Sequence, residues 1–251
     1  MAKKITLILM LLVFVSYFTA ESSMSSIAAS SRPESIKVVR SLYAVDNNNV
    51  FMPQVNGMGN SELQAKINDN LQRYVLSLNN DSPDSSLWGD FEISFYNGNL
   101  LGIHQTAISH TKRAAHPNKI DRGIHLDLTT GEIYELKDLF RVGTNYKGRI
   151  KELCRLNESS YRLTSSGQWD DWTYDVFARS WGGYNFLLSA DYVRVYDSLN
   201  FATGYYSGYG VPYADLLDII DTEGDLWKVI QSQKPMALTV INESREGRLT
   251  R

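Results

Sequence analysis

Apolar and polar residues alternate along several short stretches of the chain, as expected of strands that bury one face. These stretches are Ile36–Val45, residues 50–55, residues 91–95, Leu100–Thr111 and residues 124–128. Pro53 has no amide proton, so we expect it at a sheet edge or at a strand end. Turn residues separate the stretches, and Asn97-Gly98 is a hairpin signal. The pattern therefore predicts a meander of antiparallel strands.

Helical spacing of apolar residues appears between and after these strands. Ser61 followed by Gln64 reads as a capping box that opens a helix over residues 61–78. A second helix is predicted over Tyr146–Leu156, and a short one over residues 212–220. The apolar side of this short helix comprises Leu216, Leu217 and Ile220. Strands in a meander with helices packed on one side define an α+β fold.

The N-terminal residues have the pattern of an export signal. Lys3 and Lys4 precede an apolar run over residues 5–18, and small and polar residues follow. The run has about 14 residues, whereas a membrane-spanning helix needs roughly 20, so we expect a signal peptide over residues 1–20. The protein is then extracytoplasmic, either periplasmic or secreted, and an uncleaved short anchor is the alternative. Residues 21–35 are rich in Ser and Ala and read as a spacer.

Charge and cysteine content narrow the classes of partner. Loss of Lys3 and Lys4 with the signal peptide changes the formal net charge from −3 to −5, because no acidic residue precedes Glu21. A mildly acidic protein is a poor general binder of nucleic acid and suits a basic partner. Cys154 is the only cysteine, so an intramolecular disulfide is excluded. It shares a predicted helix face with Ile150, which favours a buried and unreactive thiol.

Several segments, taken in order, resemble a known family. They are Met52-Pro53-Gln54-Val55-Asn56-Gly57, Ile67-Asn68, Ala115-His116-Pro117-Asn118, His125-Leu126-Asp127-Leu128-Thr129-Thr130-Gly131-Glu132, Leu136-Lys137-Asp138-Leu139-Phe140, Asn185-Phe186-Leu187-Leu188, Tyr192–Tyr196, Phe201-Ala202-Thr203-Gly204 and Val211-Pro212-Tyr213-Ala214-Asp215-Leu216. Their order and spacing resemble the extracytoplasmic region of RsiV-type anti-sigma-factor proteins, a pair of adjoining modules also appended to some peptidoglycan deacetylases.

The resemblance implies a domain that senses or binds a ligand at the cell wall, and lysozyme is the partner class in the anti-sigma relatives. It divides the chain into modules over residues 36–130 and 131–220, followed by an extension over residues 221–251. Two departures limit what carries over. Only four residues precede the apolar run, so we expect no cytoplasmic segment that holds a sigma factor. The metal signature of a deacetylase domain is also absent from the sequence.

All four histidines lie between His104 and His125, which raises the question of a metal site. His104 and His110 are about 20 Å apart on one strand at ~3.3 Å per residue, so they cannot share an ion. A hairpin that brings His110 opposite His125, with His116 in the loop, would form a three-histidine cluster. Ordinary strand and loop histidines, some bonded to backbone, are the favoured interpretation, so we expect neither a metal nor another cofactor.

Aromatic residues and glycines are concentrated between residues 169 and 209. Tyr and Trp combine rigid contact area with a polar tip, which suits both protein surfaces and sugar stacking. We assign Phe186, Tyr192, Tyr196 and Phe201 to the core of the second module. The candidate ligand-binding residues are Trp169, Trp172, Tyr205, Tyr206, Tyr209 and His116.

The sequence carries no catalytic signature, neither a zinc-protease, nucleophile-elbow, phosphate-loop nor dinucleotide-binding motif. The acidic residues Asp170, Asp171 and Asp175 would need a cleft and unequal proton affinities to cleave a glycan. We therefore favour a non-catalytic domain that binds a cell-envelope ligand, either lysozyme or another basic protein, or peptidoglycan. A wall glycan hydrolase or deacetylase and a structural accessory protein are the alternatives.

Overall fold

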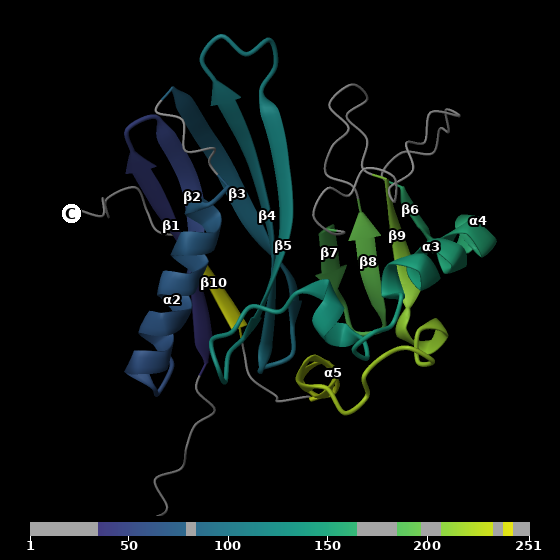
Figure 1. The fold of residues 1–251 in the computed structure, drawn as a ribbon. Coiled ribbons are helices and arrows are strands. Elements are labelled where there is room, and N and C mark those ends of the chain that lie inside the picture. Colours follow the sequence, from purple (N-terminus) through teal and green to yellow (C-terminus); the bar gives the residue numbers. More distant parts are fainter. Residues whose placement is uncertain (1–34, 79–83, 165–184, 197–206, 233–237, 243–251) are drawn as a thin grey trace, which may run out of the picture. The chain divides into compact units, whose positions relative to one another are not determined.

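The structure, a computed structural model, describes residues 35–78, 84–164, 185–196, 207–232 and 238–242, all within the compact unit Glu34–Arg251. Their strands form two sheets (Figure 1). Within these ranges, no helix has the length and apolar character needed to cross a membrane.

The first sheet has six strands in the order β10-β1-β2-β3-β4-β5. The strands are β1 Ile36–Val45, β2 Asn48–Asn56, β3 Ser85–Tyr96, β4 Leu100–Thr111, β5 Asn118–Asp127 and β10 Leu238–Asn242. Strands β3, β4 and β5 form the predicted meander, and β1 pairs antiparallel with β2. Strand β1 is parallel to β10 and β2 is parallel to β3, so the sheet is mixed. The α+β class is confirmed, while the two parallel pairs were not expected.

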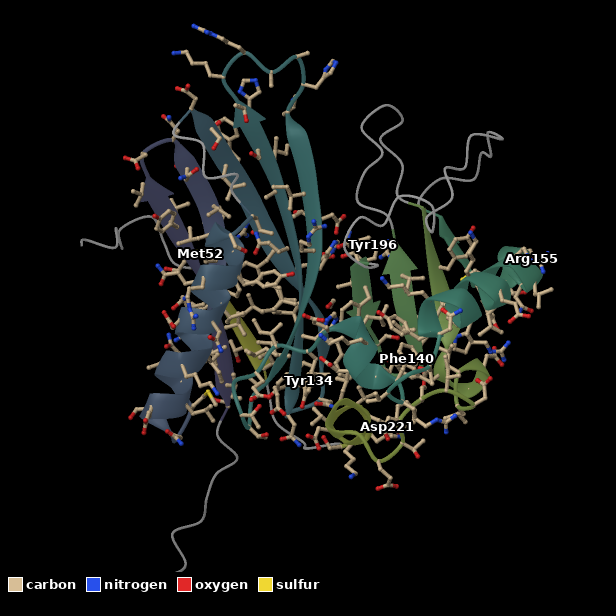
Figure 2. All side chains as sticks on the ribbon, in the orientation of Figure 1. Met52, Tyr134, Phe140, Arg155, Tyr196 and Asp221 are labelled. Atoms are coloured by element: carbon tan, nitrogen blue, oxygen red, sulfur yellow. The ribbon has the colours of Figure 1, made fainter. Side chains whose placement is uncertain are left out.

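Helix α2, Ser61–Leu76, covers one face of this sheet (Figure 1). Its buried residues follow the predicted stripe and are Ile67, Leu71 and Val75. Met52, labelled in Figure 2, belongs to the same core. The predicted cap is wrong by one residue: Asn60, rather than Ser61, caps the helix by accepting a hydrogen bond from the Leu63 amide at 3.0 Å.

Strand β2 is only partly paired on the side of β3. Its ladder with β3 consists of two residue pairs near its start. Beyond these two pairs, the backbone of β2 is hydrogen-bonded to a side chain of α2. Asn68 Oδ1 accepts from the Val55 amide at 2.7 Å, and Asn68 Nδ2 donates to the Val55 carbonyl at 3.0 Å. Pro53 lies inside β2 opposite Arg40, so it is neither at a strand end nor in an edge strand as expected. A residue without an amide proton is compatible with a partly unpaired strand.

The second sheet has four antiparallel strands in the order β6-β9-β8-β7. They are β6 Arg162–Thr164, β7 Asn185–Leu188, β8 Tyr192–Tyr196 and β9 Ser207–Pro212. Helices α3 Tyr146–Leu156, α4 Glu158–Tyr161 and α5 Asp225–Gln231 accompany this sheet, with 3-10 turns at Leu136–Leu139 and Tyr213–Asp215. These elements share a second core that includes Phe140, labelled in Figure 2.

Helix α3 has the predicted bounds and buries Cys154. Burial raises the pKa of the Cys154 thiol to about 12, as expected of an unreactive cysteine. The predicted helix over residues 212–220 is wrong, because only Tyr213–Asp215 form a 3-10 turn there. Leu217 is 48% exposed rather than buried, whereas Leu216 is buried as predicted. A 3-10 turn followed by further turns does not hold three apolar side chains on one face.

The aromatic residues assigned to the second core have different positions. Phe186 lies in that core, and Tyr196 is buried but packs toward the first sheet. Tyr192 is 38% exposed, and Phe201 lies outside the described residues. Side chains alternate along a strand, so Tyr192 points to the same side of β8 as Tyr196 and away from the core residue Val193. The assignment of Tyr192 to the core is therefore wrong.

Candidate functional site

The two sheets meet where β7 lies against β5. Gly123 of β5 permits the approach, because a methyl group at this position would overlap the carbonyl oxygen of Phe186. His125 is fully buried, and its ring stacks on that of Phe186 with centroids 4.3 Å apart. Its Nε2 accepts a hydrogen bond from the Leu188 amide at 3.0 Å. His125 of β5 thus holds β7 directly, at a point where Gly123 lets the two strands approach closely.

His125 is neutral in this setting. Burial lowers the pKa of its imidazole to about 3. Because Nε2 accepts, the ring proton resides on Nδ1, which has no hydrogen-bond partner among the described residues. This confirms the interpretation of a histidine bonded to backbone, and such a ring is not available as a general base.

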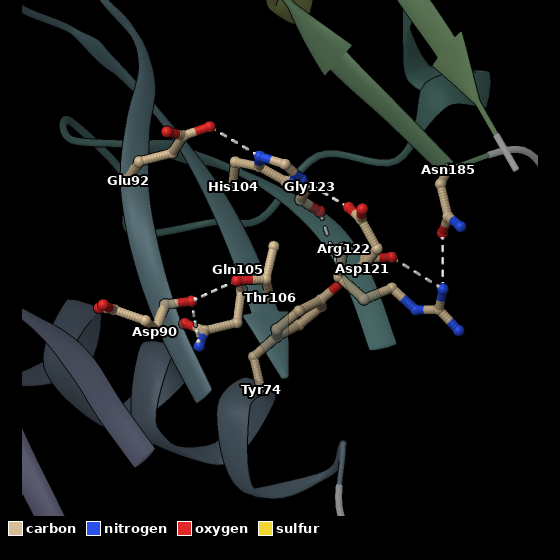
Figure 3. Close-up of polar contacts among 10 residues, drawn as sticks. All are labelled: Tyr74, Asp90, Glu92, His104, Gln105, Thr106, Asp121, Arg122, Gly123 and Asn185. Atoms are coloured by element: carbon tan, nitrogen blue, oxygen red, sulfur yellow. Dashed lines mark hydrogen bonds and ion pairs between the residues drawn. The ribbon is translucent and has the colours of Figure 1, made fainter. Parts of the chain in front are cut away.

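A second histidine at the junction has both ring nitrogens bonded to carboxylates (Figure 3). His104 Nδ1 is 2.9 Å from Glu92 Oε1, and His104 Nε2 is 2.5 Å from Asp121 Oδ1. Ionised carboxylates only accept hydrogen bonds, so both nitrogens carry protons and the ring is an imidazolium. The Asp121 side chain is fully buried and that of Glu92 is 74% exposed. The imidazolium therefore connects a buried carboxylate to one at the surface.

Electrostatics favour the charged form of His104. Burial alone would lower the pKa of His104, but the hydrogen bonds and charges of Asp121 and Glu92 outweigh burial and raise it. Tyr196 of β8, labelled in Figure 2, meets the His104 ring edge to face with centroids 6.0 Å apart. Burial, reinforced by the charge of Asp121, raises the pKa of Tyr196 well above that of a free tyrosine. Asp121 Oδ2 and the Tyr196 hydroxyl lack a hydrogen bond of good geometry within the described residues.

Further polar contacts join the same segment of β5 to its neighbours (Figure 3). Arg122 donates to Asn185 Oδ1 at 2.9 Å, which is a direct bond from β5 to the start of β7. Tyr74 of α2 donates to the Gly123 carbonyl at 3.4 Å. Helix α2, the first sheet and the second sheet therefore all contact the few residues around Gly123.

Asp127–Gly131, part of a segment that carries the family resemblance, form a turn held by hydrogen bonds. Asp127 Oδ1 accepts from the amide and the hydroxyl of Thr129, both at 2.6 Å, and from the Thr130 amide at 3.2 Å. Tyr134 donates to Asp127 Oδ2 at 3.0 Å. Gly131 follows with a φ of 76°, a conformation that glycine adopts without strain. These contacts fix the turn after β5.

Two of the predicted ligand-binding residues lie in the described part of the chain. His116 is exposed in the loop between β4 and β5. Tyr209 is half-buried on β9 and packs against the second core. The predicted residues outside the described ranges are Trp169, Trp172, Tyr205 and Tyr206, and the acidic residues Asp170, Asp171 and Asp175 also lie there. The grouping of the predicted ligand-binding residues therefore stays a prediction.

The register of β4 and β5 excludes the three-histidine cluster that the sequence left open. The ladder pairs His125 with Gly102 and ends at Ser109 and Asn118. His110 therefore lies beyond the far end of the ladder from His125. Across the described ranges, no group of three or more His, Cys, Asp or Glu side chains is placed to hold a metal ion.

Sequence reasoning missed the carboxylates around His104 and one exposed apolar pair. Glu92 lies opposite His104 in the β3–β4 register, and Asp121 lies on the adjacent strand β5. The hairpin turn after β3 was the available signal, because it fixes which residues face each other. Trp88 and Ile108 are also directly opposite in that register and are 45% and 46% exposed.

Comparison with known proteins identifies the fold. No family model matches the sequence, and a search of curated proteins finds no match. The chain is similar to a solved structure from Bacteroides fragilis described as a member of the DUF3298 family, with 13% identity and a TM-score of 0.52 over 80% of this chain and 100% of the other. A DUF3298 family protein from Pseudomonas aeruginosa has 12% identity and a TM-score of 0.45 over 74% and 91% of the two chains. The chain thus has an α+β fold like that of the Bacteroides protein.

Proposed function

We propose that this protein is an exported, non-catalytic domain that binds or senses a cell-envelope ligand, with a lysozyme-like basic protein as the first candidate. Peptidoglycan is the second candidate. The observation that carries the proposal is the commitment of the most reactive groups at the sheet junction to internal contacts.

A general base needs a free lone pair, and a nucleophile needs access and a lowered pKa. Both nitrogens of His104 are bonded to carboxylates, and Nε2 of His125 is bonded to the Leu188 amide. The thiol of Cys154 is buried with its pKa raised to about 12. Such groups stabilise a scaffold, and a scaffold supports binding rather than turnover.

The resemblance to RsiV-type proteins supports lysozyme as the partner class, and the fold is compatible with it. The formal net charge of −5 after loss of the signal peptide would favour association with a basic protein. Trp88 and Ile108 are an apolar pair on the surface. An exposed indole beside an aliphatic side chain offers contact area to a partner, which argues against a purely structural accessory protein.

The proposal is tested by titrating the purified protein with lysozyme in a calorimeter at low and high salt. We expect binding that weakens as salt rises, because the Debye length falls from about 10 Å at 0.1 M to about 3 Å at 1 M. A basic protein of similar size and charge without the lysozyme fold is the control for non-specific attraction. Equal binding of both proteins, or no binding of lysozyme, would refute the choice of partner.

Turnover is tested separately on purified peptidoglycan, with release of sugar or acetate as the readout. We expect no product above background from the wild-type protein. Product formation that disappears in His104→Gln would instead establish the hydrolase or deacetylase alternative.

The variant Trp88→Ala, compared with Leu217→Ala at another exposed apolar position, tests whether the surface at Trp88 contributes to binding.

A further inference from the structure

The junction between the two sheets depends on the protonation state of one buried side chain. His125 lies on β5, and the hydrogen bond that it accepts across the junction requires a neutral ring. Nε2 uses its lone pair to accept from the Leu188 amide, and the ring stacks on Phe186 with an interplanar angle of 23°. Gly123 has no side chain, so there is no intervening group between β5 and the Phe186 carbonyl.

We propose that His125 is an acid-sensitive latch, so that protonation of its Nε2 releases β7 from β5. A proton on Nε2 would face the Leu188 N–H group, and two donors would then point at each other. The charge would also lie in a fully buried position, where desolvation is costly. Release of β7 exposes the ring to water and removes both penalties.

Nearby charged groups do not offset this effect. Burial is the cause of the lowered pKa of His125, with no neighbouring carboxylate contributing to it. The junction's acidic residues Glu92 and Asp121 instead contact His104, and Tyr196 of β8 covers that pair. Arg122 joins β5 to β7 by donating to the neutral side-chain amide of Asn185, so this hydrogen bond does not depend on pH in the range where His125 is protonated.

The sign of the pH effect follows from proton uptake. The pKa of His125 is about 3 when the junction is closed and returns toward the ordinary 6.5 when the junction opens. Between these values the open state binds more protons than the closed state, so opening is favoured as pH falls. One proton changes the opening equilibrium by at most tenfold per pH unit below about 6.5. The pKa of His104 is shifted in the opposite direction, upward, so its titration is not the source of this acid-driven opening.

Hydrogen exchange of the β7 amides, corrected for intrinsic rates, measures this equilibrium in the purified protein. Between pH 6.5 and pH 5 we expect the protection of Phe186 to Leu188 to fall up to about tenfold per pH unit, with less change in α2. His125→Gln keeps an acceptor for the Leu188 amide without a titrating group, so its protection should be independent of pH. The matched control His116→Gln alters an exposed histidine and should behave like wild type.

Two hydrogen-exchange results would each overturn the proposal. One is wild-type protection of β7 that stays constant from pH 7 to pH 5, and the other is His125→Gln with wild-type pH dependence. If His125→Gln does not fold, the Cε1 proton resonance of His125 in the wild-type protein gives the same information. A titration midpoint near 6.5 while the β7 amides remain protected would show that the ring accepts a proton without release.

Discussion

Replacement of Asn68 by leucine should destabilise the protein although Asn68 is not part of either apolar core. Asn68 on α2 accepts from the Val55 amide at 2.7 Å and donates to the Val55 carbonyl at 3.0 Å. Val55 is fully buried, so water cannot replace the lost partners without opening the structure. Asn68→Leu keeps a side chain of similar size and leaves both backbone groups of Val55 unsatisfied.

The size of the effect follows from these two bonds. An orphaned buried polar group costs about 1–3 kcal/mol, so two such groups give about 2–6 kcal/mol. Leucine has a better helix propensity than asparagine, which offsets about 0.5 kcal/mol of this loss in stability. We therefore expect a loss near 3 kcal/mol, and at about 2–4 °C per kcal/mol for a domain of this size Tm should fall by roughly 6–12 °C.

The assay is thermal and urea unfolding followed by far-UV circular dichroism. Gln72→Leu is the matched control, since Gln72 is an exposed position one turn further along α2. It should change Tm by no more than about 2 °C, consistent with a surface substitution within ±0.5 kcal/mol. Equal stability of Asn68→Leu and Gln72→Leu would refute the view that the Asn68 side chain stabilises the protein through its hydrogen bonds to the Val55 backbone.

Three further predictions concern the junction and the thiol. Gly123→Ala should cost about 1–3 kcal/mol or more in urea unfolding, because its methyl group overlaps the Phe186 carbonyl; an unchanged midpoint would mean that β7 moves away freely. The free energy of unfolding of the wild-type protein should fall as pH rises from 6.5 through the raised pKa of His104, because the folded chain keeps a proton that the unfolded chain releases. His104→Gln should lack this decline, and a decline of the same size in both proteins would contradict the assignment. Cys154 should react with a thiol reagent at pH 8 only after unfolding in urea, since burial raises its pKa to about 12, whereas rapid labelling of the native protein would refute its burial.

Local periodicity predicted the elements that depend on local contacts. The bounds of α3 and of β1 match the predicted ranges, because amphipathic spacing and alternation each reflect one buried face. The pairs β1–β10 and β2–β3 were not predictable in this way. Parallel neighbours need a long connection, and nothing in the alternation of a strand identifies its partner. The role of Asn68 was missed for the same reason, because its partner Val55 is fixed only by the tertiary fold.

The side-chain contacts of the candidate site could not be predicted from the sequence either. The clustering of histidines between His104 and His125 was visible in the sequence, but their roles depend on strand register. One residue of slip would turn His104 away from Glu92 and toward the α2 side of the sheet. The exposed position of Tyr192 has a related cause, because β8 has polar contacts on one face and the second core on the other. An aromatic side chain alone does not indicate which face it occupies.

The pairing of β1 with β10 has a consequence for the order in which the first sheet forms. Strand β1 acquires its parallel neighbour from residues about 200 positions later in the sequence, so the six-stranded sheet cannot be completed until Leu238–Asn242 have been synthesised. A nascent chain lacking that last strand has an unfinished sheet edge. Until β10 joins the sheet, the backbone groups of β1 on that side have no strand partner, so the parallel pair is completed only after the rest of the sheet-forming chain is available.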